Sequence, residues 1–211
     1  KRLRVFDLAA ELIDADGELD VDAAGRREPE ISLAIAEAES RGRTDHATKI
    51  LPLVLVLEHT GLRFGDAVSL TPAQVLDGSI RLYTAKSGTP VSIPVPEFVL
   101  ASLEKITPAA GGYFLGDGCN LDTATGNYRR TLKAVFRAAG IPDGHPHRFR
   151  DTFSVRLLSA GVSIEAVSRL LGHSSVRITE RHYAPWVRGR QEQLDAEVRR
   201  TWPDHKLKLV G

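Results

Sequence analysis

The sequence feature that most constrains the fold is an uninterrupted apolar run in the N-terminal half of the chain. Residues 50–57, Ile-Leu-Pro-Leu-Val-Leu-Val-Leu, contain no polar side chain. The run is far shorter than the ~20 apolar residues that cross a bilayer. We therefore expect no membrane span and interpret residues 46–59 as a helix buried in the core of a folded domain.

Hydrophobic periodicity elsewhere predicts further helices and one small sheet. Residues 33–40 read as a helix, and residues 79–84 and 91–94 read as two short strands joined by a hairpin turn that contains Gly88 and Pro90. The second half of the chain reads as helix, with breaks expected at residues 140–146, Gly161, residues 172–174 and Pro185. The expected fold class is mainly α with a small antiparallel β-sheet (α+β).

Length and composition indicate one main domain. The chain has 211 residues, 42% of them hydrophobic, which is enough for one substantial core. It has no Met and starts on Lys-Arg-Leu-Arg, so we expect a piece of a longer protein. We divide it into an N-terminal remnant or linker, partly helical, at residues 1–45, and a main domain with a C-terminal helix at residues 46–211. A lone Cys119 and the lack of a signal-peptide pattern favour a cytoplasmic protein.

Charge is distributed unevenly along the chain, which bears on its partners. Residues 1–60 carry 8 Lys/Arg against 13 Asp/Glu, whereas residues 145–190 carry 8 against 3 and also four histidines. The basic segment favours an anionic partner such as nucleic acid, although many solvated helical surfaces have the same composition.

An acidic stretch at residues 14–22 has acids at alternate positions, as a calcium-binding loop does. Its sixth position is Leu19, where that loop needs glycine, and its twelfth is Gly25, where it needs glutamate. We interpret the stretch as a solvated linker. The sequence also has no Gly-rich phosphate loop and no convincing cluster of metal ligands, so we expect no cofactor.

The densest chemical pattern lies between residues 145 and 185. His147 and Arg150 are three residues apart on an expected helix, so both can address one bound phosphate. A left-handed turn at Gly172 and a cap at Ser174 would present His173 at a helix junction. Tyr183 follows near the end of the next helix, before Pro185. Taken singly, each residue has a simpler interpretation as a surface or packing residue.

Taken together, these residues resemble the C-terminal signature of the tyrosine recombinase (phage integrase) family. That signature is His-x-x-Arg, then Leu-Gly-His, then a tyrosine about ten residues later. The family also has an arginine in Thr-Gly-Leu-Arg with an acid three residues on, and a lysine in a β-hairpin turn. The matching residues, over a resemblance that spans about residues 46–200, are Arg63 with Asp66, Lys86, His147, Arg150, His173 and Tyr183.

The resemblance implies the fold of a tyrosine recombinase catalytic domain and a site-specific recombinase or integrase that cleaves and rejoins DNA through a 3′-phosphotyrosine at Tyr183, without metal or ATP. Arg63 and Arg150 would hold the phosphate, Lys86 would protonate the leaving 5′-oxygen, His147 is the candidate base, and His173 would add a hydrogen bond to a phosphate oxygen. Tyr113 and Tyr128 are other tyrosines, but neither has this context.

Several further expectations depend on the resemblance. Asp66 would orient Arg63, or is a surface acid. The partner would be double-stranded DNA, bound by a homotetramer, while the chain alone is a monomer. The segment after Tyr183 either docks on a neighbouring subunit or packs on its own domain. Because residues 1–45 are too short for the family's core-binding domain, DNA affinity would be weakened. The competing interpretations are a type IB topoisomerase and a helical DNA-binding regulator without chemistry.

Overall fold

The structure is a computed structural model, which describes residues 44–201 except 110, 117–119, 139–140 and 142–143. The expected fold class is confirmed, since helices dominate and one three-stranded antiparallel sheet is present. The helices of this part of the chain are α4 (Thr44–Thr60), α5 (Phe64–Val68), the 3-10 helix η1 (Pro72–Gln74), α6 (Glu97–Glu104), α7 (Leu121–Ala138), α8 (His147–Ser159), α9 (Ile164–Leu170) and α10 (Val176–Thr201).

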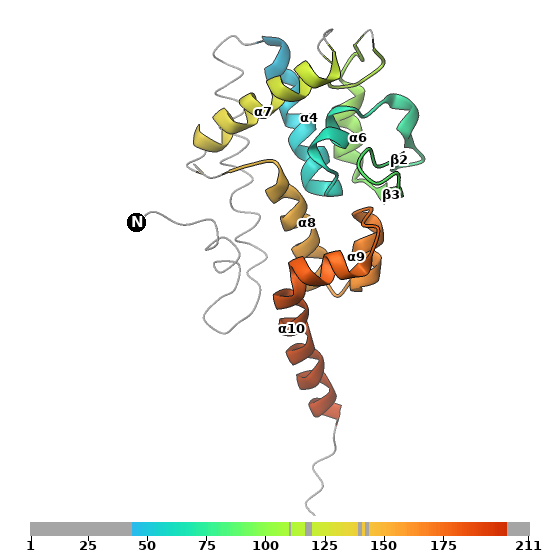
Figure 1. The fold of residues 1–211 in the computed structure, drawn as a ribbon, viewed down its shortest axis with the longest axis vertical. Coiled ribbons are helices and arrows are strands. Elements are labelled where there is room, and N and C mark those ends of the chain that lie inside the picture. Colours follow the sequence, from blue (N-terminus) through green and yellow to red (C-terminus); the bar gives the residue numbers. More distant parts are fainter. Residues whose placement is uncertain (1–43, 110, 117–119, 139–140, 142–143, 202–211) are drawn as a thin grey trace, which may run out of the picture.

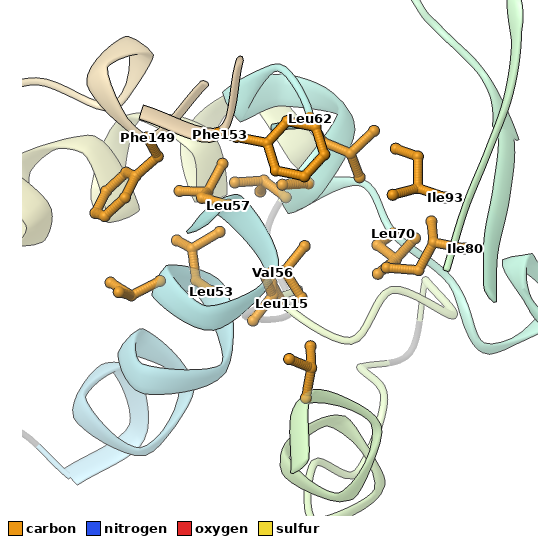
Figure 2. Packing of buried hydrophobic residues seen from close by; sticks show 14 of the residues in the cluster. Leu53, Val56, Leu57, Leu62, Leu70, Ile80, Ile93, Leu115, Phe149 and Phe153 are labelled. Carbon is orange, nitrogen blue, oxygen red and sulfur yellow. The ribbon is translucent and has the colours of Figure 1, made fainter. Parts of the chain in front are cut away.

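Helix α4 is the centre of the fold, as the apolar run predicted. Its residues Leu53, Val56 and Leu57 are fully buried, and α5, α6, α7 and α8 all pack against it. In Figure 2, Leu57 lies next to Phe149 and Phe153 of α8, and Val56 lies on another side of α4, beside Leu115. Pro52 lies inside α4, so one missing amide hydrogen bond does not end this helix.

The sheet lies near α6 in Figure 1, and its last strand packs against α9. The expected hairpin is present as β2 (Ser79–Tyr83) and β3 (Pro90–Pro94), which pair in register from Ser79 opposite Pro94 to Tyr83 opposite Pro90. A short strand β1 (Val75–Leu76) was not predicted. It pairs with β2 across a two-residue turn, Asp77-Gly78, in which both residues have positive φ.

Helices α8, α9 and α10 form the C-terminal part of the fold. An ion pair of 3.0 Å between Arg156 of α8 and Glu58 of α4 ties this part to the centre. Helix α10 packs on α8 and α9 with its first half and then leaves the body of the domain (Figure 1). Val198, near its end, is exposed.

Two sequence predictions about α10 are wrong. Pro185 does not stop it, because the helix runs on to Thr201. A proline inside a helix removes one amide donor, and its ring crowds the carbonyl four residues before it, but its φ is already helical and α10 continues in spite of this cost. Ser174 does not cap the helix either. The hydroxyl of Ser175, directly before Val176, accepts from the Arg177 amide at 3.3 Å instead.

Some sequence predictions lie outside the described residues: the helix at residues 33–40, the linker interpretation of residues 14–22, and nearly all of the N-terminal segment 1–45. Within the ranges that the structure does describe, no helix is long and apolar enough to cross a membrane.

The turn after α4 gives a stability prediction. Gly61 has φ +59, and an added Cβ would lie 2.4 Å from Phe153 Cδ1. Gly61→Ala is expected to lower the free energy of unfolding by about 2–4 kcal/mol, the sum of left-handed strain and overpacking. Urea unfolding measures this. The matched control is Gly65→Ala in α5, where a Cβ meets nothing within 4 Å. It should leave stability unchanged or raise it by up to about 1 kcal/mol. Equal effects of the two variants would contradict this account of Gly61.

Candidate active site

A buried arginine joins the two motif turns that the sequence had singled out. Arg150 on α8 is 3% exposed. Its Nη1 donates to the Gly61 carbonyl at 2.7 Å, and its Nη2 donates to the Leu171 carbonyl at 2.6 Å. Burial, followed by the nearby charge of Arg63, lowers the pKa of Arg150 to about 10, so the guanidinium stays charged at neutral pH.

The Thr-Gly-Leu-Arg turn places Arg63 beside Arg150. The Thr60 hydroxyl donates to the Val56 carbonyl and accepts from the Leu62 amide at 3.2 Å, which fixes the end of α4. Arg63 is the N-cap residue of α5. Its Nη1 is buried and has no hydrogen-bond partner among the described residues. A buried donor of this kind is available to an anion.

The Leu-Gly-His turn adopts the conformation that the sequence predicted. Gly172 has φ +61, and a Cβ there would lie 2.8 Å from Thr84 Cγ2 and 2.9 Å from Val91 Cγ1. The turn therefore packs closely on the β2–β3 hairpin and leaves His173 at the junction of α9 and α10. His173 Nδ1 is 2.7 Å from the Thr179 hydroxyl. When that hydroxyl donates, the neutral imidazole carries its proton on Nε2.

The turn with Lys86 is anchored at two points next to the arginines. Asp66 Oδ1 accepts from the Ala85 amide at 2.9 Å, and the Ser87 hydroxyl donates to the Gly172 carbonyl at 3.2 Å. Lys86 lies between these anchors and is exposed. The alternatives for Asp66 are both wrong. It is 4% exposed, so it is no surface acid, and within the described part of the chain it holds the lysine turn and forms no ion pair with Arg63.

Tyr183 projects from α10 against α8. It is 5% exposed, and its hydroxyl donates to Asp151 Oδ1 at 2.9 Å. Burial is the main cause that raises its pKa to about 12; a hydrogen bond with Ser154 opposes the increase, and the charge of Asp151 adds to it. In the free protein the phenol is therefore protonated at neutral pH.

His147 lies one helical turn before Asp151. Its Nε2 is 3.6 Å from Asp151 Oδ1, the same oxygen that accepts from Tyr183. Burial lowers the pKa of His147 below 6.5, against the opposing effect of Asp151. The sequence interpretation had not included Asp151 in the site. Its spacing of four residues from His147 on one helix was the signal that could have found it.

The structure thus gathers the predicted residues from five separate elements. Arg63, His147, Arg150, His173 and Tyr183 lie close enough for their charges to affect one another's pKa values. Lys86 reaches this group through its turn, which contacts the Leu-Gly-His segment. The two tyrosines that the sequence offered as alternatives lie elsewhere: Tyr128 is fully buried in α7, and Tyr113 lies before Phe114 in a loop. In the described ranges, no three His, Cys, Asp or Glu side chains are grouped to hold a metal ion.

A helical domain with this small sheet and this set of arginines, histidines and tyrosine has the fold of tyrosine recombinase catalytic domains. The catalytic domain of bacteriophage HP1 integrase superposes with a TM-score of 0.56 at 26% identity, covering 80% of this chain and 91% of that one. The XerA recombinase structure gives a TM-score of 0.60 at 22% identity, covering 79% of this chain and 63% of the other.

The chain belongs to the phage integrase family, whose sequence profile matches residues 27–186. The tyrosine recombinase XerC of Bradyrhizobium diazoefficiens is 30% identical over 162 residues, which are 69% of this chain and 50% of the relative. That of Rhodospirillum centenum is 31% identical over 166 residues, 72% of this chain and 46% of the relative. The chain spans about half the length of these curated relatives. The expected family is confirmed.

The environment of His173 predicts a pH dependence of stability. Burial, followed by the charges of Arg150 and Arg63, lowers its pKa from 6.5 to about 4. Between these two pKa values the unfolded chain binds more protons than the native state. The contribution of His173 to the free energy of unfolding is therefore fully present above pH 6.5 and is lost as the pH falls toward 4. NMR titration of the His173 ring should give a midpoint near 4, and His173→Gln should reduce the acid loss of stability in urea unfolding. A midpoint above 6 would contradict this reading.

The contact between Asp66 and the lysine turn predicts a local effect. Asp66→Ala removes a charge-assisted hydrogen bond worth about 1.5 kcal/mol, so the Ala85 amide should exchange with deuterium roughly tenfold faster. Asp66→Asn keeps an oxygen acceptor and should lie between the variant and the original protein. If exchange at Ala85 is the same in all three, Asp66 does not hold the turn.

Proposed function

We propose that the protein is a site-specific DNA recombinase or integrase that cleaves one strand through a covalent 3′-phosphotyrosine at Tyr183 and rejoins it by the reverse reaction. The observation that carries this proposal is the position of the Tyr183 hydroxyl, hydrogen-bonded on α8 next to Arg150. Solved relatives of this fold, among them XerH, were captured bound to their DNA substrate, before and after cleavage.

The arginines bind the phosphate in this proposal. The Nη1 of Arg63 is buried and has no hydrogen-bond partner in the described part of the chain. Arg150 donates two of its five N–H groups to carbonyls. The donors that remain can hold the non-bridging oxygens, whose negative charge grows in the pentacoordinate transition state. His173 can add a hydrogen bond from Nε2, in the tautomer whose Nδ1 accepts from the Thr179 hydroxyl.

Proton transfer completes the reaction. Lys86, exposed on its anchored turn, donates a proton to the departing 5′-oxygen. The pair of His147 and Asp151 takes up the proton of the tyrosine. Because the phosphotyrosine keeps the energy of the phosphodiester, a DNA 5′-hydroxyl can attack it and restore the strand. The step then needs neither ATP nor a metal ion, since two guanidinium groups provide the positive charge.

The partner in this proposal is double-stranded DNA, recombined by a homotetramer assembled on it. The distal half of α10 extends away from the domain body, as a segment that reaches a neighbouring subunit would (Figure 1).

The test is trapping of the covalent intermediate. Nicked duplexes from the DNA flanking the protein's own gene are incubated with the protein in EDTA, denatured, and resolved by electrophoresis. The original protein and the control Tyr113→Phe should both form a protein–DNA species that survives denaturation, whereas Tyr183→Phe should form none. DNA that is bound but never linked would overturn the proposal in favour of a binding protein without chemistry.

A further inference from the structure

One carboxylate lies between the nucleophile and the histidine of the site, although no motif residue predicted it there. Asp151 Oδ1 accepts the Tyr183 hydroxyl at 2.9 Å and lies 3.6 Å from His147 Nε2. Ser154 of α8 is also a hydrogen-bonding neighbour of the Tyr183 hydroxyl, but Asp151 is the carboxylate that accepts from it. His147 therefore contacts the same carboxylate oxygen that accepts the hydrogen bond from Tyr183.

Exposure differs between the two partners of this hydrogen bond. Tyr183 is 5% exposed, whereas the side chain of Asp151 is 45% exposed. The tyrosine hydroxyl is thus largely shielded from water. The carboxylate of Asp151, which accepts its hydrogen bond, is in contact with water. Asp151 joins a buried hydroxyl to the solvent.

Loss of the Tyr183 proton to water has an electrostatic cost in this pair. If Tyr183 loses its proton to solvent, a phenolate and a carboxylate remain in contact, and this repulsion adds to burial in raising the tyrosine pKa. If the proton moves onto the carboxylate, the pair keeps a single negative charge, now on the attacking oxygen. Arg150 stabilises a charge at that position.

We propose that Asp151 is the catalytic base of strand cleavage, with its Oδ1 accepting the Tyr183 proton as the phenolic oxygen attacks phosphorus. The inference rests on the proposed function, in which Tyr183 is the nucleophile. The Tyr183 O–H bond breaks and an Asp151 O–H bond forms; the tyrosine oxygen bonds to phosphorus and the bond from phosphorus to the 5′-oxygen breaks. The leaving oxygen takes its proton from Lys86. In rejoining, Asp151 returns the proton to Tyr183.

His147 is a positioning residue in this scheme. At 3.6 Å from Oδ1 and one helical turn away, it fixes the carboxylate toward α10. The groups that face the pair are His147 and Arg150 of α8 and His182 of α10, whose ring is 6.3 Å from that of Tyr183.

The opposite role for Asp151 is a latch that keeps the hydroxyl away from the phosphate. The two roles predict opposite effects. Removing a latch speeds cleavage, whereas removing a base slows it.

Single-turnover cleavage of the nicked duplexes by the intact protein tests the assignment. Asp151→Asn keeps the shape and an acceptor oxygen but is not basic, so we expect cleavage about 10²–10⁴-fold slower with DNA binding unchanged. Its rate should rise with pH, as hydroxide replaces the missing base. Asp151→Glu keeps a carboxylate and should recover part of the rate. Asp122→Asn, at the exposed start of α7, is the matched control and should cleave like the original protein.

A second measurement identifies the proton that is transferred. A fluorinated tyrosine at position 183 has a lower phenol pKa and needs less help from a base. It should restore part of the rate in Asp151→Asn and none in Lys86→Ala, whose defect lies at the leaving oxygen.

The outcomes separate the two proposals. If the original protein forms no covalent species, or Tyr183→Phe still does, the proposed function fails. If those two behave as expected and Asp151→Asn cleaves as fast as the original protein or faster, only the base assignment is overturned. Failure of the fluorinated tyrosine to restore Asp151→Asn would also overturn it.

Discussion

The site depends on one buried guanidinium. Arg150 donates to carbonyls of Gly61 and Leu171, which lie 89 and 21 residues away in sequence. A buried carbonyl without a partner costs about 1–3 kcal/mol, so each of these turns is held where the arginine can reach it. The end of α4, the first turn of α8 and the end of α9 therefore meet at a single side chain. Every other group of the site takes its position from one of these three segments.

The charge of that guanidinium also sets the state of its neighbours. Together with burial and Arg63, it keeps His173 neutral by lowering its pKa to about 4. Tyr183 has the opposite environment, because burial and Asp151 raise its pKa to about 12. In the absence of DNA, the phenol is therefore protonated and lies near arginine N–H groups that have no hydrogen-bond partner among the described residues. In our proposals, a phosphate satisfies these donors and the proton moves to Asp151.

Close packing brings the hairpin to the same place. Gly172 lies against Thr84 and Val91 with no room for a Cβ, and Ser87 donates to its carbonyl. Asp66 holds the other side of the turn through the Ala85 amide. Lys86 is exposed, yet its backbone is fixed from two directions. The backbone of this turn is held in place while the lysine side chain extends into solvent. This arrangement suits a group that must donate a proton to a departing oxygen.

The sequence by itself determined the buried helix α4, the β2–β3 hairpin and the identity of the motif residues, because these depend on local patterns of apolar residues, glycines and spacing. It also contains a local signal for β1, the Asp77-Gly78 turn between β1 and β2. Only the tertiary structure decided that α10 continues through Pro185, that Asp66 serves the lysine turn, and that Asp151 accepts from Tyr183. Each of these features depends on contacts between residues that are distant in sequence. The free energy of such contacts is not encoded in any local sequence pattern.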